Sequence, residues 1–202
     1  MTPPELRGVQ EDYFDVLSQM PHITHRGYDL LLAVSAGKPV DAAGAADLVL
    51  KTINAYDDWQ NWIEKLFDGP MLPPEEIPSP RGDSQFPTVY KYDDPWKATG
   101  YIVALSCMLI CNMVFMATGY GGDRSAEGKD LLDKICKSVE TVAEGPCGPY
   151  RVSFGLRIGF EAATPEVREW IKGWLHDFEA RFKAADVETY PKITAAEMLS
   201  AS

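Results

Sequence analysis

One long uncharged segment constrains the fold of this chain more than any other feature. From Ala98 to Gly122 the sequence carries no charged residue, and a helix of this length is sufficient to cross a bilayer. A helix that is apolar on all sides is either a membrane span or the centre of a larger helical core. Ser106 and Asn112 interrupt the segment, no second such segment occurs, and amphipathic patterns lie on both sides of it. We therefore predict an all-α fold, a single-domain multi-helical bundle around a central uncharged apolar helix, with no membrane span.

Apolar residues at spacings of three and four predict three amphipathic helices around the central one. They cover residues 43–67, 125–142 and 165–182. The last of them follows Thr164, a favourable N-cap residue, and has a proline in its first turn. The central helix has two candidate N-caps, Asp93 and Asp94, directly before Pro95. Helices of this kind can surround an apolar helix and bury it.

Helix-breaking residues predict how the remaining segments are divided. Residues 11–20 and 28–35 are predicted to form two short helices, separated by a loop that contains Pro21 and Gly27. Prolines crowd the stretch MLPPEEIPSPRGDSQFP, which predicts an extended crossover loop and disfavours a helix or a central strand. We divide the chain into an N-terminal helical flank (1–42), a helical core domain (43–190) and a tail (191–202) that is a peripheral helix or disordered.

Composition limits the partners and the compartment. With 202 residues and 46% hydrophobic residues, the chain suits one domain with a sizeable core. Its net charge of −11 disfavours direct contact with nucleic acid, because a polyanion would be repelled. The four cysteines form neither a CxxC pair nor a dense disulfide framework, and MTPPELRGVQEDYF holds no apolar signal stretch. We expect an intracellular, cytoplasmic location.

Two quoted stretches carry a family resemblance. A proline-rich segment ends in FPTVYKYDDPWKA, and the chain continues after the apolar helix with GPYRVSFGLRIGFEAATPEVREWIKGWLHDF. Together with the tryptophan-containing helix before them, they resemble the C-terminal part of the fungal-specific (middle-homology) regulatory domain of binuclear zinc cluster transcription factors. The resemblance extends over about Ala43 to Phe182 and rests on diffuse apolar and aromatic patterns. It implies a helical regulatory domain and a nuclear location.

The chain departs from that family in its cysteines. Four cysteines cannot build a six-cysteine zinc cluster, so we predict no metal site. Neither Gly37-Lys38 nor GYGGDR matches a nucleotide-binding glycine motif, so we predict no cofactor. His22 and His25 are close in sequence, but the neighbouring breakers favour a surface loop over a metal site. Cys107 and Cys111 share one face of the apolar helix and have no cationic neighbour in sequence, which favours core residues over nucleophiles.

The aromatic and methionine residues are the best candidates for a small-molecule binding site. Such side chains either fill a core or line an adaptable apolar pocket, and the sequence leaves both interpretations open. The predicted substrate-binding residues are Trp59, Trp62, Tyr92, Trp96, Tyr101, Met108 and Met116. The predicted catalytic residues are Asn112, which needs a hydrogen-bond partner if buried, and Asp57 and Asp58 on the tryptophan helix. For the two aspartates, a solvated helix face is the alternative.

The residue pattern and the family resemblance together are compatible with two functions, and a third interpretation is simpler. The first is a small-molecule-binding protein of fungal secondary metabolism, acting as a cofactor-free cyclase or pericyclase, similar to a Diels-Alderase, on an apolar metabolite. The second is a transcription-regulator effector domain that binds a ligand or partner protein without contacting DNA. The third is an interaction module that forms a homodimer through an exposed apolar stripe on its last long helix.

Overall fold

The computed structural model describes residues 4–68, 73–144, 147–182 and 194–200. The elements are α1 (Pro4–Leu17), α2 (Met20–Ser35), α3 (Ala42–Phe67), β1 (Glu75–Pro78), β2 (Thr88–Lys91), α4 (Pro95–Thr118), α5 (Ser125–Val142), α6 (Gly148–Ala162), α7 (Pro165–Phe182) and α8 (Ala195–Ser200). Helices make up nearly all of the regular structure, and the one small sheet has two strands. The predicted all-α fold is confirmed.

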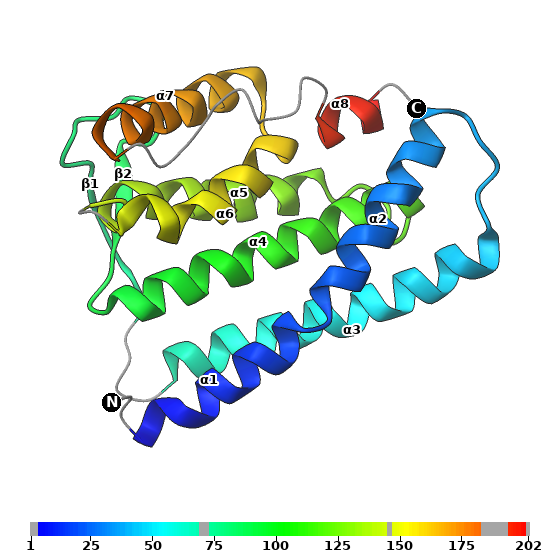
Figure 1. The fold of residues 1–202 in the computed structure, drawn as a ribbon, viewed down its shortest axis with the longest axis horizontal. Coiled ribbons are helices and arrows are strands. Elements are labelled where there is room, and N and C mark those ends of the chain that lie inside the picture. The colour runs from blue at the N-terminus through cyan, green and yellow to red at the C-terminus, as the bar shows by residue number, and fades with distance from the viewer. Residues whose placement is uncertain (1–3, 69–72, 145–146, 183–193, 201–202) are drawn as a thin grey trace.

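Helix α4 is the centre of the bundle. It runs through the middle of the molecule, with α3 on one side, α5 and α6 on the other, and α2 crossing its C-terminal half (Figure 1). Among the described helices, α4 alone is long and apolar enough to cross a membrane, but 78% of its apolar window is buried within the protein. The apolar side chains of α4 therefore pack in the hydrophobic core of the protein. None of the described helices is a clear membrane span.

The ends of α4 follow from local chemistry. Of the two candidate N-caps, Asp94 takes the position, because its carboxylate accepts a hydrogen bond from the backbone N–H of Lys97 at 2.8 Å. At the other end Gly119 adopts a left-handed conformation with φ of 70°, and its N–H donates to the carbonyl of Met116. A glycine reaches this conformation without steric cost, so the helix stops there.

The predicted loop between the first two helices is wrong. Helix α2 is continuous from Met20 to Ser35 and contains both supposed breakers. Pro21 is tolerated because it lies in the first turn, where a backbone N–H has no partner inside the helix. Gly27 lies where α2 crosses α4, and a Cβ at this position would lie 2.6 Å from Cγ2 of Val114. The glycine therefore allows close contact between two helices and does not end one.

The segment predicted as an extended crossover loop contains a short strand, β1, which is an edge strand and not a central one. Strands β1 and β2 pair in antiparallel register, with Ile77 opposite Val89. Pro78 is tolerated because it ends an edge strand. Val89 is buried on the side of α5, and the hydroxyl of Thr141 in α5 donates to the carbonyl of Tyr90. Packing against α5 thus stabilises a hairpin that would be marginal alone.

Candidate functional site

Two cavities lie beside the C-terminal half of α4. Cavity A has a volume of about 240 Å³ and lies between α2, α4, α6 and α8; its lining includes Tyr28, Leu31, Ile110, Met113, Ile158 and Glu161. Cavity B has a volume of about 510 Å³ and lies between α4, α5 and the end of α6; its lining includes Leu109, Asn112, Met113, Met116, Gly128 and Leu132. Both cavities are mainly apolar, as small-molecule sites usually are.

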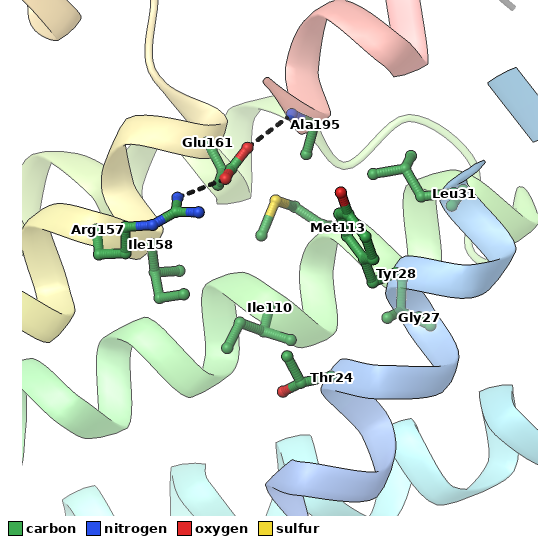
Figure 2. A pocket seen from close by; sticks show the side chains of 12 residues that line it. Thr24, Gly27, Tyr28, Leu31, Ile110, Met113, Arg157, Ile158, Glu161 and Ala195 are labelled. Carbon is green, nitrogen blue, oxygen red and sulfur yellow. Dashed lines mark hydrogen bonds and ion pairs between the residues drawn. The ribbon is translucent and has the colours of Figure 1, made fainter. Parts of the chain in front are cut away.

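One ion pair borders cavity A. Figure 2 shows Arg157 and Glu161, one turn apart on α6, with their side chains in contact. The Arg157 guanidinium donates to the Glu161 carboxylate at 2.5 Å, and the second carboxylate oxygen accepts from the N–H of Ala195 at 2.9 Å. The charged edge of the cavity is thus tied to the start of α8.

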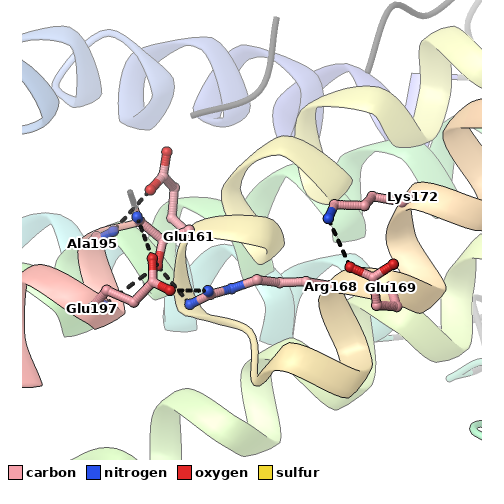
Figure 3. A network of polar contacts seen from close by, with 7 residues as sticks. Glu161, Arg168, Glu169, Lys172, Ala195 and Glu197 are labelled. Atoms are coloured by element: carbon pink, nitrogen blue, oxygen red, sulfur yellow. Dashed lines mark hydrogen bonds and ion pairs between the residues drawn. The ribbon is translucent and has the colours of Figure 1, made fainter. Parts of the chain in front are cut away.

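Helix α8 contributes Ala195 to the lining of cavity A and is held by a second group of contacts (Figure 3). Arg168 of α7 donates to the Glu197 carboxylate at 2.8 Å and to the Thr194 hydroxyl at 2.6 Å. The Thr194 N–H and hydroxyl also donate to Glu197. The hydrogen bond from the Thr194 N–H, with Arg168 beside it, lowers the pKa of Glu197 to about 2. These contacts fix α8 against α6 and α7 as long as Glu197 is ionised.

Asn112 is the buried polar residue of cavity B. Its side chain is 1% exposed, and its Nδ2 donates to the Glu127 carboxylate and to the Arg124 carbonyl, both at 3.3 Å. Because both partners are acceptors, the amide group can only face them with its nitrogen. The amide oxygen then lies beside Gly128, where a Cβ would come within 2.8 Å of it. No hydrogen-bond donor from the described part of the chain reaches that oxygen.

Glu127 links Asn112 to α3. The Tyr56 hydroxyl donates to the Glu127 carboxylate, and Arg124 pairs with the same carboxylate. Burial, followed by this hydrogen bond to Glu127, raises the pKa of Tyr56. The Arg124 guanidinium also lies 4.6 Å from the centre of the Phe115 ring. This network holds the Asn112 amide in one orientation.

Sequence reasoning missed Tyr56, Arg124 and Glu127 as members of a site. A signal for two of them exists, because Arg124 and Glu127 are opposite charges three residues apart at the start of a helix, where an acidic side chain is favoured. Nothing in the sequence connects Tyr56 to them, since this contact depends on how α3 and α5 pack around α4.

Of the predicted site residues, only Asn112 and Met116 line either of the two cavities, whereas the predicted aromatic residues contact one another elsewhere. Asn112 and Met116 both line cavity B. The predicted aromatic residues lie around the other end of α4, and by helix rise Trp96 is roughly 24 Å along the axis from Asn112. The core holds Trp59, Trp62, Tyr101 and Met108 as buried residues, with Trp96 and Tyr92 packed against them. The Trp62 indole N–H donates to the carbonyl of Val9 at 2.8 Å.

The predicted carboxylates lie away from Asn112. Asp57 is exposed, which is the solvated-face alternative, and the half-buried Asp58 accepts a hydrogen bond from Gln19 at 2.9 Å. The Tyr92 hydroxyl is paired with that of Ser138 at 2.6 Å. The carboxylate that Asn112 contacts belongs to Glu127 of α5.

The histidine and cysteine residues build no second site in the described regions. His22 and His25 are exposed on α2 rather than in a loop, and no group of three or more potential metal ligands occurs in the described part of the chain. Burial raises the pKa of Cys111 to about 12 and that of Cys107 well above its usual value. These thiols are core residues.

Comparison of the chain with protein-family models, with curated proteins and with solved structures finds no match.

Proposed function

We propose that this protein binds an apolar small molecule in cavity B and holds one polar group of that molecule at Asn112. The observation that carries the proposal is a buried, oriented amide in the wall of a mainly apolar cavity, whose lining also includes Ser125, Lys129 and Thr164. The volume of about 510 Å³ falls in the range of roughly 300 to 1,000 Å³ typical of small-molecule sites. A few convergent polar groups in such a cavity fix the orientation of a ligand.

The amide of Asn112 acts as an acceptor in this proposal. Its nitrogen is already engaged with Glu127 and Arg124, and its oxygen has no donor from the described residues. The oxygen can therefore accept from a hydroxyl or N–H group of a ligand, and one such hydrogen bond contributes roughly 0.5 to 1.5 kcal/mol. The ligand class is therefore an apolar molecule with one hydrogen-bond donor.

Cofactor-independent cyclisation of an apolar fungal metabolite is the reaction that we propose for this site. It requires a cavity that folds a flexible chain and one or two hydrogen bonds to a reacting group. Met113 and Met116 give the wall an adaptable shape, and Asn112 supplies the hydrogen bond. In this proposal Asn112 is the catalytic residue and accepts a hydrogen bond from a hydroxyl or N–H group of the substrate.

Ligand sensing in transcriptional regulation is the second candidate. The resemblance of residues 43–182 to the fungal-specific regulatory domain supports it, and the same cavity would bind the effector. This function would place the protein in the nucleus. The homodimer interpretation has less support, because the apolar stripe of α7 is not exposed: Ile171, Leu175 and Phe178 are buried in the core.

Calorimetric titration with a naphthol and with its methyl ether tests the binding proposal. The two probes share an apolar body, and only the naphthol has a donor. The naphthol should bind about two- to tenfold more tightly, the range that one hydrogen bond provides. Asn112→Leu should abolish the difference, whereas Asn61→Leu, a matched change at an exposed position of α3, should preserve it.

Binding of neither probe would refute the proposal. To separate the two candidate uses, the protein is incubated with fungal metabolite extracts, and the products are compared by mass spectrometry with those of a boiled control. A changed product distribution without added cofactor supports the cyclase, and bound ligand without turnover supports the regulator.

A further inference from the structure

Met113 is common to both cavities. On α4, Ile110 and Ala117 face cavity A, while Leu109 and Met116 face cavity B. Met113 lies between these two stripes and contributes to both linings. Residues three and four apart lie on one face of a helix, so the two stripes are adjacent along the same stretch of α4. The cavities are therefore neighbours separated in part by one side chain.

Helix α6 repeats this arrangement on the opposite wall. Ile158 and Glu161 line cavity A, and Ala162, the next residue, lines cavity B. Figure 2 shows the thioether of Met113 extending between the residues that α2 contributes and those that α6 contributes. Methionine has three rotatable bonds and adapts its shape readily, so Met113 is suited to a movable partition.

We propose that cavities A and B are two parts of one binding site and that its ligand is an elongated apolar alcohol. The hydroxyl group donates to Asn112 in cavity B, and the apolar chain passes Met113 into cavity A. This inference rests on the proposed function, because it takes cavity B as the place where the polar group binds.

The far end of cavity A favours an uncharged chain end. Arg157 and Glu161 are paired with each other, and Glu161 also accepts from the N–H of Ala195. A ligand carboxylate would have to compete with Glu161 for the guanidinium, whereas an alkyl end contacts Leu31, Ile158 and the other apolar walls. Each methylene that enters cavity A should tighten binding about fourfold.

Alanine methyl groups report which cavity is occupied. Ala117 lines cavity A, Ala126 and Ala162 line cavity B, and Ala46 on α3 is an exposed control. The wild-type protein, labelled at its alanine methyl groups, is titrated with hexanol and with dodecanol and followed by NMR. Hexanol should shift the cavity B methyl groups alone, and dodecanol should shift Ala117 as well. Ala46 should not move with either alcohol.

Met113→Phe tests the partition directly. A rigid ring at this position should abolish the shift of Ala117 by dodecanol and weaken dodecanol about tenfold or more, while hexanol changes by less than about twofold. If dodecanol shifts only the cavity B methyl groups of the wild-type protein, or if hexanol reaches Ala117 alone, the shared site is overturned while small-molecule binding stands. If neither alcohol shifts any of these methyl groups, the proposed function itself fails for this ligand class.

Discussion

Replacing Gly27 with alanine should destabilise the crossing of α2 and α4. The new Cβ would lie 2.6 Å from Cγ2 of Val114, closer than two carbon atoms can approach without displacement. Val114 is 4% exposed, and its β-branched side chain has restricted rotation. The two helices, which both line cavity A, would have to separate locally.

The expected magnitude combines two opposing effects. Glycine to alanine in a helix interior gains roughly 0.5 to 1 kcal/mol, and overpacking a core costs roughly 1 to 3 kcal/mol. Gly27→Ala should therefore lower the free energy of unfolding by up to about 2.5 kcal/mol, with a central value of about 1 kcal/mol. Gly173→Ala on α7 is the matched control, because nothing lies within 4 Å of its new Cβ, and it should raise that free energy by roughly 0.5 to 1 kcal/mol.

Urea denaturation followed by circular dichroism measures both variants. A double-mutant cycle with Val114→Ala isolates the clash, because this second change removes the methyl group that meets the new Cβ. The cycle should show the Gly27→Ala penalty shrinking by at least about 0.5 kcal/mol in the Val114→Ala background. If Gly27→Ala stabilises the protein as much as Gly173→Ala does, the close-approach explanation for this glycine is refuted.

Three further predictions concern other described features. Tyr56→Phe removes the donor to the Glu127 carboxylate and should lower the free energy of unfolding by about 1 kcal/mol, measured by urea denaturation; an unchanged midpoint would show that this contact contributes nothing. Because the pKa of Glu197 is lowered to about 2, its contribution is fully present above the unfolded-state pKa near 4 and is lost as the pH falls towards 2. Hydrogen exchange of the α8 amides should accordingly be unaffected down to about pH 4, after correction for intrinsic rates, and accelerate below it; acceleration already at pH 6 would contradict the assignment. Iodoacetamide should modify the native protein at the exposed Cys147, and should reach the buried Cys107, Cys111 and Cys136 only after unfolding, which mass spectrometry would detect.

Periodicity was sufficient to predict the long helices. The bounds of α3, α5 and α7 agree with the expected ranges to within a residue, because the ends of an amphipathic stripe coincide with nearby capping or helix-breaking residues. The uncharged helix lies in the core as its composition predicts. Prediction failed where a residue that usually breaks a helix is needed instead for contact between two helices. Gly27 is interpreted locally as a helix breaker, but a close helix crossing is its actual role.

The candidate site was less predictable for a related reason. Asn112 was identified because a polar residue within an apolar helix requires a partner. The identity of that partner, Glu127, depends on the packing of α5 beside α4. The aromatic residues were misleading as pocket candidates, because large rings fill a core and line a cavity equally well. The structure shows that Trp59 and Trp62 fill the core, because their rings pack against Tyr13.

The near-complete enclosure of α4 has a consequence for how this sequence can change during evolution. Of the residues in α4, only Pro95 at its first position is exposed, and the helix contacts α2, α3, α5, α6 and α8 on its different sides. A surface helix tolerates substitutions on its solvent-exposed face, but α4 has no such face. Each substitution in α4 therefore changes the packing against one of the neighbouring helices. Divergence should therefore concentrate in the outer helices, and α4 should keep its residue volumes longest.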